Sequence, residues 1–160
     1  MKRIIMSLAL LLAVTQPAHA DGGKMQSPPN ALWQEECGSC HAAFPPRLLT
    51  EENWKQLMAN LDKHFGDNAE LSAKDRQAIE SYLTRNAGSG ARHSAVSLRI
   101  TETPWFLREH RSVSPKEWVH PEVKSRANCT ACHQNIAQNR WSEHSISIPG
   151  RGRWYDDDDD

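Results

Sequence analysis

Long hydrophobic runs and an excess of charge of one sign are both missing from this sequence. Of its 160 residues 38% are hydrophobic and the mean hydropathy is -0.70, which excludes a protein that crosses a membrane several times. The 19 basic and 20 acidic residues leave a net charge of -1, whereas a nucleic-acid-binding protein needs a basic face. The apolar fraction is low for a chain that forms one domain or two small ones. We therefore expect something besides side chains to fill part of the interior.

The one apolar run that is present lies at the N-terminus. Lys2 and Arg3 precede an apolar stretch over residues 4–14, and Ala18 and Ala20 are the small residues that signal peptidase requires. The stretch is shorter than the ~17 residues of a membrane span, which disfavours the alternative of an uncleaved anchor. We expect residues 1–20 to be a Sec signal peptide that exports the chain to a bacterial periplasm. Its removal leaves 17 basic and 20 acidic residues, a net charge of -3.

Apolar side chains recur at three- and four-residue spacing in the first half of the mature chain. Thr50 is a candidate helix cap, and the apolar stripe after it consists of Trp54, Leu57, Met58, Leu61 and Phe65. A second helix is expected over residues 72–86, with Ile79, Tyr82 and Leu83 facing inward. Residues 21–30 should form a mobile lead-in. The pattern predicts a helical domain over residues 31–88 that ends at a linker, Gly88-Ser89-Gly90.

The second half of the chain has no clear hydrophobic period. Pro104 prevents a long helix from crossing residues 100–113. Ser114 and Glu117 form a capping box around Pro115, and Pro121 keeps the helix that follows short. No segment alternates as a strand does. We expect a second domain over residues 91–150 and a disordered tail over residues 151–160, which ends in five aspartates.

One chemical motif occurs twice, as Cys37-Gly38-Ser39-Cys40-His41 and Cys129-Thr130-Ala131-Cys132-His133. Both read C-x-x-C-H, the attachment sequence of c-type haem. Two cysteines three residues apart lie on one face of a helical turn, where both sulfurs can reach the vinyl groups of one porphyrin. Disulfides or a zinc site would not explain the histidine after each pair, and no βαβ pattern supports a thioredoxin-like motif. We predict two covalent haem c groups, held by the four cysteines, with His41 and His133 as proximal iron ligands. Two macrocycles would also fill the interior.

The second axial ligand of each iron must come from elsewhere in the chain. Five histidines of the mature chain lie outside the motifs, and this surplus favours bis-histidine ligation over methionine, of which Met58 belongs to the apolar stripe. We choose His64 for the first haem. For the second we choose His110, with His144 as the alternative, and Arg108 or Arg111 could pair with the haem propionates. His93 and His120 are expected at the surface.

These motifs, in this order, resemble the diheme cytochrome c family of bacterial periplasmic electron carriers. The stretches that carry the resemblance are the first attachment motif with Phe44-Pro45-Pro46, residues 54–58, His64-Phe65-Gly66, residues 101–104, Arg108-Glu109-His110, the second attachment motif and residues 146–149. The resemblance implies a mainly α fold, with an N-terminal module like a small class I cytochrome c and a less regular C-terminal haem module. It also implies that both haems are low-spin and bis-histidine ligated.

The function implied by this resemblance is electron transfer without catalysis. Electrons would come from a membrane cytochrome b and pass to a small periplasmic haem protein. We expect a monomer with no nucleic-acid partner and at most a peripheral membrane contact. The alternative is a small haem enzyme, a peroxidase or reductase, with one open iron site, although no distal acid–base pair stands out. A haem-based sensor would need an attached signalling domain.

Overall fold

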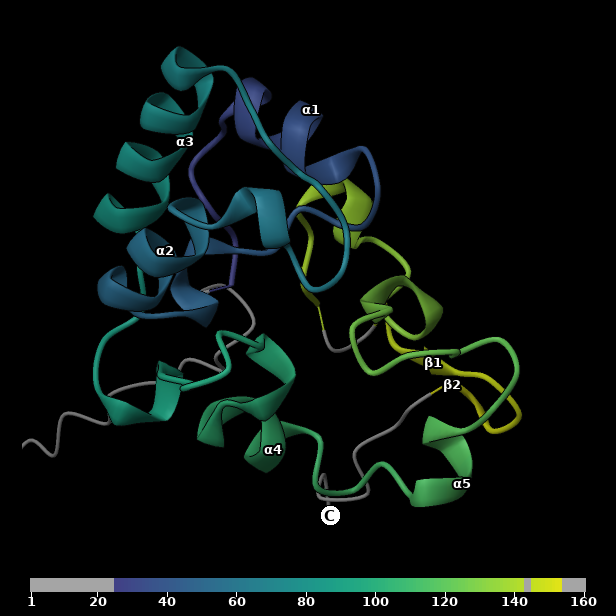
Figure 1. The fold of residues 1–160 in the computed structure, drawn as a ribbon. Coiled ribbons are helices and arrows are strands. Elements are labelled where there is room, and N and C mark those ends of the chain that lie inside the picture. The colour runs from purple at the N-terminus through teal and green to yellow at the C-terminus, as the bar shows by residue number, and fades with distance from the viewer. Residues whose placement is uncertain (1–24, 143–144, 154–160) are drawn as a thin grey trace, which may run out of the picture.

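A computed structural model describes residues 25–142 and 145–153. Three helices form its first half and two shorter helices with a small hairpin form its second half (Figure 1). The elements are α1 (Ala31–Gly38), α2 (Glu51–Met58), α3 (Ala73–Arg85), α4 (Pro104–Glu109), α5 (Pro115–Trp118), β1 (Ser147–Ile148) and β2 (Gly152–Arg153). The expectation of a mainly α chain is confirmed, whereas the division into two modules stays a prediction. The signal peptide, His144 and residues 154–160 of the tail lie outside the described residues. The start of the expected disordered tail is wrong, because Gly152–Arg153 form β2 and Arg151 pairs with Glu117.

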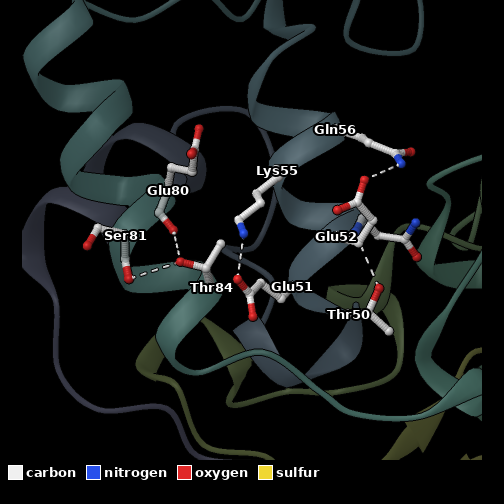
Figure 2. Close-up of polar contacts among 9 residues, drawn as sticks. Thr50, Glu51, Glu52, Lys55, Gln56, Glu80, Ser81 and Thr84 are labelled. Carbon is white, nitrogen blue, oxygen red and sulfur yellow. Dashed lines mark hydrogen bonds and ion pairs between the residues drawn. The ribbon is translucent and has the colours of Figure 1, made fainter.

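The first half is built around the packing of α2 on α3, and both helices begin where the sequence predicts. Thr50 accepts a hydrogen bond from the Asn53 amide at 3.3 Å, and Ser72 accepts one from the Asp75 amide at 3.1 Å. Polar pairs such as Lys55–Glu51 and Gln56–Glu52 stay on the outside of α2 (Figure 2). The apolar faces meet in one buried cluster: Trp33, Leu49, Trp54, Met58, Leu61, Ile79, Tyr82 and Leu83.

The expected apolar stripe does not continue as one helix to Phe65, so that expectation is wrong. α2 ends at Met58, and Leu61–Lys63 form a single 3-10 turn. Phe65 has a φ of 54° and 43% of its surface is exposed. A left-handed residue followed by glycine ends a helix, because the backbone leaves the helical path there. His64 therefore lies in a turn, where the Asp67 amide donates to its carbonyl at 3.1 Å.

The second half has little regular structure, as expected. α4 begins at Pro104, where the missing amide hydrogen costs nothing, and Thr103 caps it. The predicted capping box of α5 is present, with Ser114 and Glu117 as its partners. β1 and β2 pair antiparallel over two residues each, Ser147 with Arg153 and Ile148 with Gly152. Strands of two residues carry no alternation, which is why the sequence did not indicate them.

Two segments expected to be loose are packed. The lead-in is tied at Ser27, whose carbonyl accepts from the Asn139 side chain at 2.8 Å, and at Pro28, whose carbonyl accepts from the Tyr82 hydroxyl at 2.8 Å. A mobile lead-in is therefore wrong for this part. In the expected linker, the Gly88 amide donates to the Leu49 carbonyl at 2.8 Å. All three contacts join distant parts of the chain.

His93 is also not at the surface. It is 1% exposed, and its ring stacks on Trp105 at 5.8 Å between centres. An ideal Cβ on Gly88 would lie 2.8 Å from the His93 ring, so glycine permits this packing. Among the described residues, no helix is long and apolar enough to cross a membrane.

Candidate functional site

The first attachment motif follows from the end of α1. Cys37 lies in the last turn and is partly buried, while Cys40 and His41 follow the helix and are exposed. The His41 Nδ1 lies 2.8 Å from the Ala42 carbonyl. A carbonyl can only accept, so Nδ1 carries the proton and Nε2 is free to bind a metal. The Phe44 ring stacks on the His41 ring, with 4.7 Å between ring centres.

His64 lies opposite His41. The two ring centres are 6.2 Å apart and the ring planes differ by 23°. An imidazole nitrogen binds a metal about 2 Å away and the ring centre lies roughly 1 Å farther on, so two rings facing each other across one metal have centres about 6 Å apart. The turn over residues 64–67 thus brings His64 to a distance that accommodates an iron.

The second attachment motif forms a 3-10 turn, Cys129–Ala131, and the His133 amide closes it by donating to the Cys129 carbonyl at 2.8 Å. His110, at the end of α4, is 6.2 Å from His133 between ring centres, with the planes 71° apart. The His110 Nδ1 donates to the Phe106 carbonyl at 2.9 Å, which leaves its Nε2 free. The structure thus brings together both histidine pairs that the sequence proposed. His144, the alternative to His110, lies outside the described residues.

Aromatic rings surround the second pair. Phe106 stacks on His110 with 4.0 Å between centres, Trp118 lies 5.9 Å from His110, and Trp141 lies 5.6 Å from His133. Trp105, which precedes Phe106 in α4, instead stacks on His93. Trp118 and Trp141 were not singled out from the sequence, because only the fold brings them near His110 and His133. The four-residue spacing of Phe106 and His110 along α4 was a readable signal.

Burial controls the protonation of the site residues. It raises the pKa of the Cys37 thiol to about 11 and that of the Cys129 thiol to about 12, and it raises the pKa of Cys132 as well. Burial, with His110 nearby, lowers the pKa of His133 to about 4. Burial also lowers the pKa of His64 and His110. Neutral imidazoles are the form that binds iron, and thioether bonds to haem would remove the ionisable thiols.

The proposed propionate partners have other contacts. Arg108 forms an ion pair with Glu109 at 2.6 Å, and Arg111 donates to the Arg108 carbonyl at 3.2 Å. Arg126, which the sequence did not single out, lies 5.1 Å over the Trp118 ring. His120 is half-buried, and an ideal Cβ on Gly150 would lie 3.3 Å from its ring. Met58 is 2% exposed within the core cluster, as expected for a core methionine.

The residues present fit two haem groups better than a metal bound by protein alone. None of the four cysteines forms a disulfide, so all four sulfurs are available for thioether bonds. Within the described part of the chain, no group of three or more His, Cys, Asp or Glu could hold a metal ion. Each histidine pair supplies two ligands, and the remaining four ligands of an iron would be the porphyrin nitrogens. Two attachment motifs, each with one facing histidine pair, match two haem c groups.

Comparison with known proteins supports the assignment of two haem c groups. The sequence model of the dihaem cytochrome c family matches residues 33–141. A diheme cytochrome c structure from Shewanella baltica OS155 is 38% identical, with a TM-score of 0.69, covering 80% of this chain and 99% of that chain. The DHC structure from Rhodobacter sphaeroides is 39% identical, with a TM-score of 0.62, covering 71% and 98%. Among curated proteins, none matches significantly. This chain belongs to the dihaem cytochrome c family and carries two covalently bound haem c groups.

Proposed function

We propose that the protein is an exported electron carrier in which histidine pairs bind both irons, His41 with His64 and His110 with His133. The main support for this proposal is that both pairs have the same separation of 6.2 Å between ring centres. Two pairs with different backbone surroundings share the one spacing that an iron between them requires. In each motif the cysteines attach the haem, Cys37 and Cys40 in the first and Cys129 and Cys132 in the second.

Filled axial positions favour electron transfer over catalysis. An iron with a histidine on each side has no position for substrate, whereas a peroxidase or reductase needs an open one. Bound haem supplies an iron that changes between the ferrous and ferric states. The protein's own part is to fix the imidazoles. The carbonyls of Ala42 and Phe106 hold His41 and His110 by their Nδ1 hydrogens, so the ligand geometry changes little between oxidation states.

The cellular setting is part of the same proposal. The signal peptide over residues 1–20 would place the protein in the periplasm, where c-type cytochromes typically act. There it would receive electrons from a membrane cytochrome b and pass them to a small periplasmic haem protein. Thioether attachment keeps haem on a protein in that compartment.

Spectroscopy of the full-length holoprotein tests the ligation. We expect two low-spin ferric signals in the electron paramagnetic resonance (EPR) spectrum and no high-spin signal. Carbon monoxide should leave the reduced optical spectrum unchanged, because no axial position is open. A high-spin signal, or a large spectral shift with carbon monoxide, would contradict the proposal and favour the small haem enzyme. Intact mass should show the mature chain plus two haem masses.

A further inference from the structure

A hollow between α4 and α5 leads from the surface to His110. It has a volume of about 180 Å³, and its lining includes Phe106, Leu107, His110, Val113, Trp118 and Arg126. Most of these side chains are apolar, and none is acidic. Leu107 is 50% exposed, and Val119, which follows Trp118, is 79% exposed. Leu107 and His110 both line the hollow, so an exposed apolar side chain lies beside a proposed iron ligand.

The charges around this hollow are mostly positive. Arg126 lines it and lies over the Trp118 ring, and no carboxylate of residues 25–142 or 145–153 pairs with it. Two nearby acidic side chains are already paired, Glu109 with Arg108 at 2.6 Å and Glu117 with Arg151 at 3.5 Å. Among the described residues 104–126, four basic side chains form no ion pair: Arg111, Lys116, Lys124 and Arg126. In the same range only one acidic side chain, Glu122, forms no ion pair.

Residues 25–90 and residues 91–153 differ in the sign of their net charge. Residues 25–90 contain six basic and nine acidic residues, whereas residues 91–153 contain ten basic and five acidic residues. Residues 154–160 add five aspartates, so residues 91–160 together contain ten basic and ten acidic residues, and the positive excess is confined to residues 91–153. A protein with one acidic and one basic end can orient two different partners, because each end attracts surfaces of opposite charge.

We propose that the hollow and its basic rim, which we define as Leu107, Lys116, Trp118, Val119 and Arg126, form the docking surface for an acidic redox protein. The proposal rests on the proposed function, since it takes His110 as a ligand of the second iron. An apolar centre with a rim of one charge is typical of transient protein contacts. The partner's acidic rim would pair with Lys116 and Arg126, and its apolar centre would cover Leu107 and Val119. Docking there brings the partner's redox centre close to His110, and one electron passes from the reduced protein to the oxidised partner.

Two electron acceptors that differ in the sign of their charge test whether this surface binds an acidic partner. Mitochondrial cytochrome c is basic, and succinylation of its lysines makes it acidic while its haem is kept. The fully reduced holoprotein is mixed with each ferric acceptor at about 10 mM ionic strength, where screening extends over roughly 30 Å. The variant with both Lys116→Gln and Arg126→Gln should reduce the succinylated acceptor roughly fivefold more slowly. Its rate with the native, basic acceptor should change little, because that acceptor docks at the acidic half.

Controls separate a local surface from net charge and from misfolding. Lys74→Gln removes one positive charge from the exposed start of α3 and should leave both rates unchanged. Arg126→Lys should keep the wild-type rate, because it keeps the charge. Lys116→Gln alone removes the charge of an exposed side chain and should lower the rate by itself. At about 0.5 M salt the difference between wild type and the double variant should vanish.

Three outcomes would overturn the proposal. Equal rate losses in Lys74→Gln and Lys116→Gln would show that only net charge acts. Unchanged rates in the double variant would remove the surface from the reaction. Sedimentation of the wild type, but not the double variant, with phosphatidylglycerol vesicles, together with unchanged rates, would make the surface a membrane contact. The EPR spectrum of the wild type tests the histidine ligation without any partner. Failure of the proposed function can therefore be distinguished from failure of the docking proposal.

Discussion

The imidazole rings of His110 and His133 face each other at 6.2 Å with their planes 71° apart. The His41 and His64 rings have the same separation, but their planes are only 23° apart. The angle between axial imidazole planes affects the electronic structure of a low-spin ferric iron, because the π orbital of each ring overlaps with the iron d orbital whose lobes are perpendicular to that ring. The two haems of this protein should therefore be distinguishable.

We predict two different low-spin EPR signals. The near-parallel pair, His41 and His64, should give a rhombic spectrum with three resolved g values. The near-perpendicular pair, His110 and His133, should give a broader signal with a larger maximal g value. Low-temperature EPR of the oxidised protein measures both, and two superimposable rhombic signals would contradict the geometry.

Replacement of His110 with Ala should convert only the second haem. Loss of the imidazole opens one axial position, so that haem becomes high-spin or water-ligated while the first haem stays low-spin. The EPR and optical spectra measure the change, and His120→Ala serves as a control because His120 lies outside both pairs. If His144→Ala produces the change and His110→Ala does not, the assignment of His110 is wrong.

Both reduction potentials should be low. A histidine pair lacks the thioether ligand that raises the potential of a His/Met cytochrome. Spectroscopic redox titration should place both haems below such a cytochrome, and His64→Met should raise the potential of the first haem only. His120→Met should leave both potentials unchanged. A methionine–iron charge-transfer band in the wild type would instead implicate Met58.

Substitution of Gly88 with Ala should destabilise the protein. An added Cβ would lie 2.1 Å from the Arg47 carbonyl oxygen and 2.8 Å from the His93 ring, so the backbone must shift. Overpacking of this kind costs about 1–3 kcal/mol of unfolding free energy. Thermal denaturation of the holoprotein measures it. Ser89→Ala, at the exposed neighbouring position, should change the stability by less than about 0.5 kcal/mol.

Replacement of Thr103 with Ala should weaken α4 and, through it, the position of His110. The Thr103 hydroxyl is buried, accepts from the Phe106 amide at 3.1 Å and donates to the Ile100 carbonyl at 2.8 Å. Loss of such a cap costs about 0.5–2 kcal/mol, which denaturation measures. The EPR signal of the second haem should also broaden. Thr103→Ser, which keeps the hydroxyl, should preserve the signal. An unchanged signal in Thr103→Ala would show that the Thr103 cap does not fix the position of His110.

Local signals in the sequence were sufficient for the two attachment motifs and the helix starts. The C-x-x-C-H spacing is a property of five consecutive residues, and the caps at Thr50, Ser72 and Ser114 act within one turn. The end of α2 was misjudged because the stripe continues in sequence to Phe65, whereas the helix ends at Met58 and the backbone at Asn60 has a non-helical φ of -128°. Periodicity describes which side chains are apolar and does not show where the backbone leaves the helix.

The sequence by itself determined that this chain attaches two haems, because that chemistry needs only neighbouring side chains. It proposed His64 and His110 from a surplus of histidines, but left His144 open. Only the tertiary structure decided that His110 lies 6.2 Å from His133, that His93 is buried against Trp105, and that Arg126 lies over Trp118 beside the hollow. These contacts join residues distant in sequence, and their positions depend on how the whole chain packs.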